Sequence, residues 1–170
     1  AVTGDPFCVG VAEAAGGYVD GSLVVRDGGV ASTFVWVRSG LEGWILPDAP
    51  DAVVEVDQVG CLYNPRVVGV QTDQTLRLLN SDGVLHNVHT RPRRNREKNL
   101  AMPGEVTQRD LDFKRPEVMI EMVCDVHAWM KGWIGEVEHP YFTVSDEDGR
   151  WSLEGLPPGT YELELWHERL

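Results

Sequence analysis

Short runs rich in β-branched and aromatic residues alternate with turn-forming sequences along most of the chain. The turns include Asp-Gly at 20–21 and 82–83 and Pro-Pro-Gly at 157–159. This alternation is typical of all-β sandwiches and barrels. We therefore expect strands within residues 22–25, 33–37, 53–56, 118–123 and 160–166.

A helix of three turns with recognisable caps is hard to find in this pattern. The best candidate runs from Asp5 to Ala15, and its Pro6 and Gly10 lower the helical propensity of that segment. The predicted fold class is therefore all-β.

Strand periodicity places three reactive side chains on apolar faces, because alternate residues of a strand point to opposite sides of the sheet. One face of segment 117–124 carries Val118, Ile120, Met122 and Cys124. One face of segment 161–167 carries Tyr161, Leu163, Leu165 and His167. The same alternation aligns His139 with Trp133 and Val137. A site needs such residues on these faces, and structural histidines also occur there.

Composition narrows the class of protein. The 170 residues are 42% hydrophobic and 25% charged, which fits a globular chain with one core or two small intertwined ones. A net charge of −12 argues against a general nucleic-acid binder, which needs a basic face. No apolar run reaches the roughly 18 to 20 residues that a membrane span requires. The sequence begins at Ala1 with neither an initiator Met nor a signal pattern, as a processed mature chain or a shortened chain would, so export is permitted but not shown.

The strongest chemical signal is a Cys-x-x-His-x-x-Met sequence formed by Cys124, His127 and Met130. A thiolate, an imidazole and a thioether in one tight loop are ligands suited to copper. Electron-transfer copper sites use two imidazoles and one thiolate, with a weak thioether contact. The pattern therefore needs a second histidine from elsewhere, and His86 is the natural supplier.

These residues resemble the cupredoxin family, in which an upstream His-Asn-Val precedes a Cys, His and Met loop. Here His86-Asn87-Val88 is followed 36 residues later by the loop that starts at Cys124. The resemblance implies four copper ligands, namely His86, Cys124, His127 and Met130. It also implies that Asn87 ties the two ligand segments together. The chain departs from the family pattern in having no proline beside His127.

A second resemblance covers the flanks. Residues 142–161 are similar to the carboxypeptidase regulatory-like, transthyretin-like β-sandwich, and residues 21–25 and 34–37 resemble its opening strands. The two resemblances together predict a cupredoxin-like Greek-key sandwich over residues 51–138. Residues 1–50 and 139–170 would supply the opening and closing strands of the smaller sandwich.

The three cysteines cannot all pair. A bridge between Cys8 and Cys61, both outside the copper motif, would leave Cys124 as the free thiolate that a metal requires. Such a bridge would stabilise the fold by roughly 4 kcal/mol in the chain-entropy model and would indicate an oxidising compartment, periplasmic or extracellular. The alternative is that Cys8 and Cys61 are buried free thiols.

The other histidines exceed what one copper needs. His89, His139 and His167 are either structural groups or ligands of a second copper or a cluster. In a regular strand His86 and His89 face opposite ways, so a shared site would need a bulge or a strand end. Trp129 and Trp133, beside the Cys124 loop, are expected to cover the site, and an electron path is the alternative role, compatible with the first. A nucleophilic Cys-His pair is an alternative use of Cys124, but no orienting acid accompanies it.

One basic run interrupts the acidic chain, with five cations within eight residues: Arg91, Arg93, Arg94, Arg96 and Lys98. It is either a solvated loop or a docking patch for an anionic redox partner beside the copper. These features together predict a one-electron carrier rather than an enzyme. A multinuclear or catalytic copper centre, copper storage or delivery, and a partner-binding module with structural copper are the alternatives.

Overall fold

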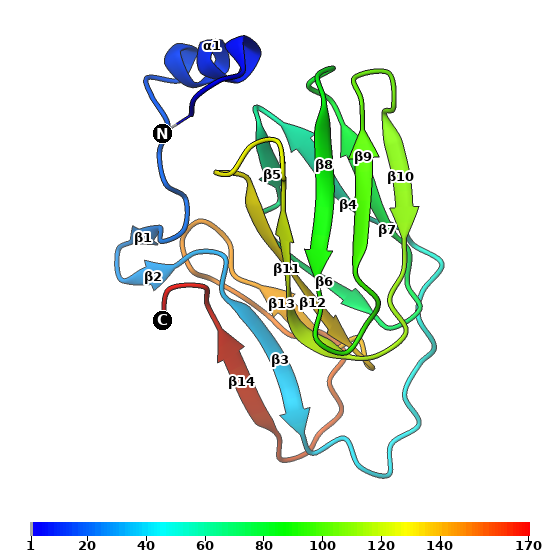
Figure 1. Ribbon diagram of the computed structural model, residues 1–170. Coiled ribbons are helices and arrows are strands. Elements are labelled where there is room, and N and C mark those ends of the chain that lie inside the picture. The colour runs from blue at the N-terminus through cyan, green and yellow to red at the C-terminus, as the bar shows by residue number, and fades with distance from the viewer. Residues whose placement is uncertain (1) are drawn as a thin grey trace.

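The computed structural model describes residues 2–170, which form one helix and fourteen strands (Figure 1). In chain order the elements are α1 (Pro6–Ala14), β1 (Val25–Arg26), β2 (Gly29–Val30), β3 (Phe34–Ser39), β4 (Val54–Val59), β5 (Leu62–Asn64), β6 (Val67–Gln71), β7 (Leu76–Asn80), β8 (His86–Arg91), β9 (Lys98–Met102), β10 (Gln108–Leu111), β11 (Glu117–Val123), β12 (Lys131–Val137), β13 (Phe142–Val144) and β14 (Glu162–Trp166). The all-β prediction is confirmed.

Two sheets form the central sandwich. One has the strand order β10-β7-β4-β5 and the other the order β6-β12-β11-β8-β9. Each sheet contains one parallel pair, β4 with β7 and β12 with β6, while its other pairs are antiparallel. The core between the sheets is fully buried at Val56, Leu78, Val88, Ile120 and Ile134. These residues come from the alternating apolar positions of their strands.

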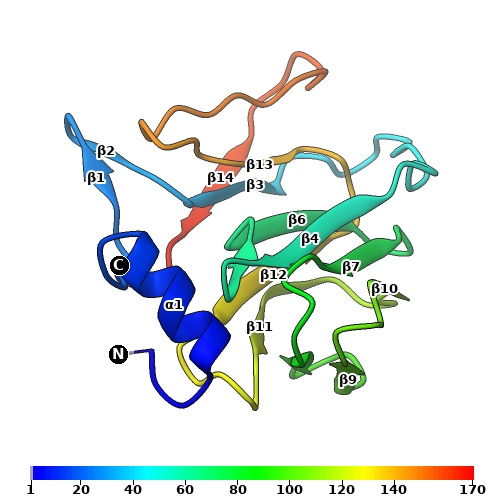
Figure 2. The ribbon, with the colours of Figure 1, turned by 90° about the horizontal axis from the view of Figure 1, so that it is seen from above.

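A third layer, the sheet β13-β3-β14, packs on the outer face of the five-stranded sheet (Figure 2). Two glycines that are neighbours across β6 and β12, Gly69 and Gly135, make this contact possible. A Cβ atom on Gly135 would lie 2.5 Å from the ring of Phe34, and one on Gly69 would lie 2.3 Å from the ring of Phe142. The two aromatic rings therefore occupy the space that side chains would otherwise fill.

The third layer combines β3, from the first 50 residues, with β13 and β14, from the last 32. Strands far apart in the sequence are thus neighbours in one small sheet. The resemblance of these flanking strands to a transthyretin-like sandwich stays a prediction.

Two sequence predictions about strands are wrong. Residues 22–24 are not in a strand, and β1 contains only Val25 and Arg26. In β14 the expected inward row is open to solvent, since Leu163 is 38% and Leu165 is 56% exposed. Trp166, on the opposite face, packs against the five-stranded sheet instead. On that outer face of the layer Val35 and Val37 of β3 are buried, whereas Leu163 and Leu165 of β14 stay exposed.

Helix α1 lies at the end of the sandwich where β8 begins and β11 ends (Figure 1). The carboxylate of Asp5 caps it by accepting hydrogen bonds from the backbone N–H groups of Phe7 and Cys8. Pro6 occupies the first turn, where a proline favours helix formation because its missing N–H would be unpaired anyway. Of the helical residues only Cys8 is buried.

A disulfide joins Cys8 of α1 to Cys61, which lies between β4 and β5. Cys124 is the free cysteine among the described residues, and it is buried. The predicted pairing is confirmed. The bridge attaches α1, in which only Cys8 is buried, to the sandwich. Across residues 2–170, no helix has the length and apolar character needed to cross a membrane.

Candidate metal centre

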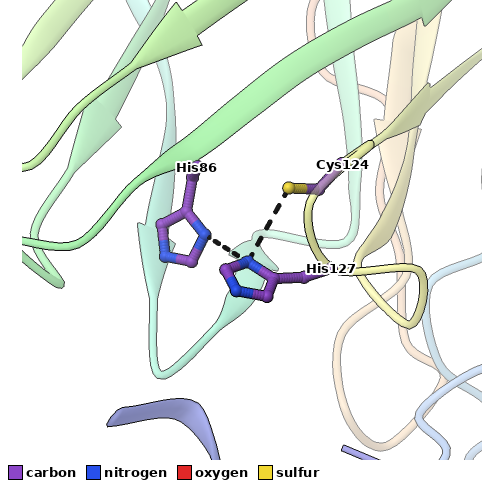
Figure 3. Close-up of side chains that lie close together, drawn as sticks. All are labelled: His86, Cys124 and His127. Carbon is purple, nitrogen blue, oxygen red and sulfur yellow. Dashed lines mark hydrogen bonds between the residues drawn. The ribbon is translucent and has the colours of Figure 1, made fainter. Parts of the chain in front are cut away.

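Three potential metal ligands meet at the end of the sandwich next to α1 (Figure 3). One ligand atom from each of His86, Cys124 and His127 lies within 4.8 Å of the other two. The Nδ1 atoms of the two histidines are 2.9 Å apart, and Sγ of Cys124 is 3.8 Å from Nδ1 of His127. All three side chains are at most 3% exposed. The two Nδ1 atoms and the sulfur therefore face a common, dry centre.

Two strands and one tight loop hold these groups. His86 opens β8, and Cys124 follows directly after β11, which pairs with β8 in antiparallel register. The loop returns into β12 through two backbone hydrogen bonds, from N of Met130 to O of His127 and from N of Cys124 to O of Met130. The three-residue spacing thus becomes a closed turn, which turns the ring of His127 back toward Cys124.

Met130 is fully buried and belongs to the core between the two sheets. It stands where the loop re-enters β12, one residue before Lys131. Its place in the loop keeps it next to the His and Cys ligands along the chain, while its thioether also packs as an ordinary core side chain. Its assignment as the fourth ligand stays a prediction.

Asn87 joins β8 to the Cys124 loop. Its Oδ1 accepts hydrogen bonds from the backbone N–H of Asp125, at 2.7 Å, and from Sγ of Cys124, at 3.3 Å. Its Nδ2 donates to Asn99 and Asp125. The hydroxyl of Tyr63 donates to the carbonyl oxygen of Asn87 at 2.6 Å, which fixes the backbone there as well. Asn87 therefore connects both ligand-bearing segments.

The surroundings of the three ligands make the Cys124 thiol easier to deprotonate than burial alone would allow. Burial alone would raise the pKa of Cys124, but hydrogen bonds from His86 and from backbone N–H groups lower it overall. Burial would lower the pKa of His86, and the Asp82 carboxylate and Cys124 outweigh this and raise it to about 9. Burial and the neighbouring charge of His86 lower the pKa of His127. His127 is thus neutral at pH 7, with a lone pair available to a metal.

Two carboxylates behind the imidazoles were not predicted from the sequence. Oδ2 of Asp82 lies 2.9 Å from Nε2 of His86, and Oδ2 of Asp5 lies 3.7 Å from Nε2 of His127. The only signal for Asp82 is its position four residues before His86. Asp5 carries no such signal, because 122 positions separate it from His127.

The two tryptophans beside the loop have different surroundings. Trp129 covers His127, with ring centroids 5.0 Å apart, and its Nε1 donates to the carbonyl oxygen of Cys61. Trp133 points to the other side of the five-stranded sheet and packs against Trp166 in the third layer. The expectation that Trp133 covers the site is therefore wrong, because its strand position faces the third layer.

The remaining histidines are not brought to this centre. His89 faces away from His86 on β8 and lies within 3.0 Å of the carboxylates of Asp125 and Glu97. His139 lies 2.8 Å from the carbonyl oxygen of Val37. His167 accepts a hydrogen bond from the backbone of Arg169. Among residues 2–170, no cluster of three potential metal ligands contains any of these histidines.

The basic run does not lie beside the ligand group, contrary to expectation. His86 and Arg91 are the two ends of β8, and an extended strand rises about 3.3 Å per residue, so about 17 Å separates them. The chain then turns into β9 at the far end of the sandwich (Figure 1). There the backbone N–H groups of Arg93, Arg94 and Asn95 donate to the carboxylate of Glu117.

Comparison with known proteins gives matches in structure alone. No protein-family model and no curated protein matches the sequence. One similar solved structure is a Cu-containing nitrite reductase from Thermus scotoductus SA-01, with TM-score 0.44 and 21% identity. The match covers 51% of this chain and 23% of the reductase chain.

Two amicyanin variants are also similar, one in the Cu(I) form with TM-score 0.44 and one oxidised with TM-score 0.45. Each is 18% identical, and each match covers 60% of this chain and 97% of the amicyanin chain. The similarity concerns the fold alone.

The donor set itself fits copper. One thiol with a lowered pKa and two imidazole nitrogens form a soft-to-borderline set that suits copper. All three groups are buried, so few water molecules compete for the centre. The outer nitrogen of each imidazole faces a carboxylate, which leaves the two Nδ1 atoms toward the centre.

Proposed function

We propose that this chain binds one copper ion through His86, Cys124 and His127, with Met130 as a weaker fourth ligand, and carries single electrons. The convergence of the three buried ligand atoms within 4.8 Å is the observation that carries the proposal. Bound copper would supply reversible one-electron chemistry. The protein's own contribution is to present the ligands already assembled.

The ligands are held by the scaffold before a metal arrives. Asn87 links both ligand-bearing segments, and the loop from Cys124 to Met130 is closed by two backbone hydrogen bonds. A ligand set fixed in this way changes little between two oxidation states, so little reorganisation accompanies electron transfer. This low reorganisation supports a role as an electron carrier.

Burial favours a carrier over a catalytic copper centre. A catalytic metal needs an open coordination position, whereas the exposed fractions of His86, Cys124 and His127 are 0%, 3% and 1%. The disulfide and α1 also cover His127, which favours retention of the metal over delivery. The disulfide further supports an oxidising compartment, so we place the protein in the periplasm or outside the cell.

A redox partner would approach the end of the sandwich that carries His86, Cys124 and His127, which is the metal end of the molecule. Electron transfer slows steeply with the distance between the partner and the metal. Apolar side chains are exposed there beside the ligands, with Leu85 at 46%, Val126 at 48% and Phe7 at 39%. The basic run at the far end of β8 is then a steering or solvating feature rather than the point of contact.

Copper titration of the wild type and of Cys124→Ser tests the proposal. We expect the wild type to take up one Cu(II) per chain, with an intense thiolate charge-transfer band and a single electron paramagnetic resonance signal. Cys124→Ser should lose the band, because a hydroxyl cannot replace the thiolate. His89→Gln is the matched control, since His89 shares β8 with His86 but faces away, and it should keep the wild-type spectrum.

Two results would overturn the proposal. One is a wild type without a thiolate band at saturating copper. The other is a band that azide or another added ligand shifts, which would indicate an open position. A second equivalent of tightly bound copper that His89→Gln removes would support the multinuclear alternative instead.

A further inference from the structure

The Cys8–Cys61 disulfide is linked to both histidines of the metal centre. Each cysteine donates its backbone N–H to a carboxylate, and that carboxylate faces the outer nitrogen of one ligand imidazole. The metal centre itself requires neither connection, because the three ligands already converge through β8 and the Cys124 loop.

On the His86 side the connection is tight. The Asp82 carboxylate accepts hydrogen bonds from the N–H of Gly60 at 2.7 Å and of Cys61 at 2.8 Å. Its Oδ2 lies 2.9 Å from Nε2 of His86, and the side chains of Asp82 and His86 are 4% and 0% exposed. The turn that carries Cys61 therefore holds the carboxylate that orients His86.

On the His127 side the connection is looser. Oδ1 of Asp5 accepts from the N–H of Cys8 at 3.2 Å, and its Oδ2 lies 3.7 Å from Nε2 of His127. The latter distance is too long for a hydrogen bond, so Asp5 acts through its charge. Sγ of Cys8 itself lies 3.7 Å from Nε2 of His127. The disulfide thus packs directly against the ring.

We infer that the disulfide is a positioning element of the metal centre, which acts through Asp82 on His86 and through Asp5 on His127. The inference deepens the proposed function and rests on it for its purpose. The arrangement of the disulfide and the two carboxylates can be tested without any metal.

The physical effect is a choice of nitrogen. A carboxylate beside Nε2 keeps the proton on that atom, and Nδ1 then points its lone pair, or a proton that a metal displaces, toward the centre. Without the carboxylates, either nitrogen of a neutral imidazole can carry the proton. The rings would also lose the contacts that fix which nitrogen faces the centre.

Nitrogen-15 NMR of the histidine rings in the metal-free protein at pH 7 tests the inference. In the wild type, we expect protons on Nε2 of both His86 and His127, protected from exchange with water. Asp82→Asn should shift or abolish the His86 signal, because an amide no longer holds that proton by charge. Asp5→Asn should affect only the His127 signal, and weakly, since the carboxylate lies 3.7 Å from that ring, and the helix should stay intact because Asn also caps helices.

Reduction of the disulfide should disturb both ring signals at once. Asp110→Asn is the matched control. Asp110, on β10, is a carboxylate outside the ligand group, and it is paired with Arg77 on β7. It should leave both signals unchanged. The Asp variants keep the disulfide, so they still decide the question if the reduced protein loses its native methyl spectrum.

Copper affinity supplies the second readout. Loss of a partner behind a ligand costs about 10- to 100-fold in metal affinity, and we expect this for Asp82→Asn. For Asp5→Asn we expect no more than the lower end of that range. Ring signals and copper affinity that both stay at wild-type values in Asp82→Asn and in the reduced protein would refute the positioning role. A wild type with the expected ring signals but no copper binding would instead refute the proposed function and leave the positioning role standing.

Discussion

At the start of β8, His86 is buried among potential ligands and carboxylates, whereas at its end Arg91 precedes a loop that holds three more of the five cations of the basic run. At the metal end, residues 2–14, 60–62, 81–86, 103–107 and 124–130 contain no Lys or Arg, and Lys131, which follows Met130, is paired with Glu121. Seven of the 15 cations lie at residues 91–98 and 114–115. One strand therefore connects an acidic end, which holds the candidate metal centre, with a basic end.

Each end is organised around a buried carboxylate, but with opposite results. At the metal end Asp82 faces His86, and the hydrogen bond from that ring helps to lower the pKa of the carboxyl group despite burial. At the basic end Glu136 is fully buried, and burial and the nearby Glu117 raise its pKa to about 7. Its Oε1 has no hydrogen-bond partner among the described residues. The buried carboxylate at the metal end therefore has a basic partner, whereas Glu136 has no ion pair among the described residues.

The largest expected effect is on stability at the metal end. Replacing both Cys8 and Cys61 by Ala should lower the free energy of unfolding by about 4 kcal/mol, because the bridge closes a loop of 53 residues in the unfolded chain. Urea unfolding measures this. Reduced wild type is the matched comparison and should unfold at the same urea concentration. A loss below about 1 kcal/mol would show that α1 contributes little to the fold.

The second effect concerns the basic end. Asn95 donates to Glu117 and Glu136 and accepts from the backbone of Lys114 and Arg115. Asn95→Ala should cost about 3 kcal/mol, since it leaves several partly buried groups unpaired. The copper spectrum should not change. An altered thiolate band in this variant would show that the two ends of the sandwich are coupled.

The third effect is a pH dependence located at Glu136. Its folded pKa of about 7 exceeds its ordinary value of 4.5, so its favourable contribution is complete below about pH 4.5 and is lost as the pH rises through about 7. Glu136→Gln should therefore gain stability relative to the wild type between pH 5 and pH 8, on the order of 2 kcal/mol. Urea unfolding across this range checks the slope. Parallel curves for the two proteins would contradict it.

The smallest effect is on electron transfer with small ions. Oxidation of the reduced copper protein by hexacyanoferrate(III) should change less than about twofold in Arg96→Glu, because about 17 Å exceeds the screening length of about 8 Å at 0.15 M salt. Glu105→Lys, in segment 103–107 at the metal end, should speed the same reaction several-fold at low salt, because it replaces a negative charge with a positive one. Stopped-flow measurement of the oxidation rate in both variants checks these expectations. A larger effect from Arg96→Glu would place the electron exit at the basic end.

Local patterns were enough to predict the fold class and the ligand types. Alternating runs gave the strands that contain Phe34 and Ile120, and the spacing from Cys124 to Met130 indicated a copper loop. The disulfide followed from sorting three cysteines, because only Cys124 belonged to the ligand pattern. The strands and the closed turn of the loop were predictable because strand periodicity and tight turns are properties of neighbouring residues. Copper ligation by the loop stays a prediction.

Other features depend on contacts that no local pattern records. The exposure of Leu165 and the burial of Trp166 were misjudged, since periodicity separates the two faces of β14 but does not say which one is covered. Asp5 was missed because α1 reaches His127 only through the fold. The prediction that the basic run lies near His86 is wrong, because an extended strand separates residues that are close in sequence.

The amino-acid sequence alone therefore determines which strands form, which donors a metal would find and which cysteine stays free, because these follow from residue chemistry and short spacings. Tertiary structure decides that His86 and Arg91 lie at opposite ends, since an extended strand separates residues that a turn would bring together. It also decides that the disulfide, Asp5 and Asp82 surround the ligand imidazoles. Only the packing of α1 and of the Cys61 turn on that end of the sandwich brings them there.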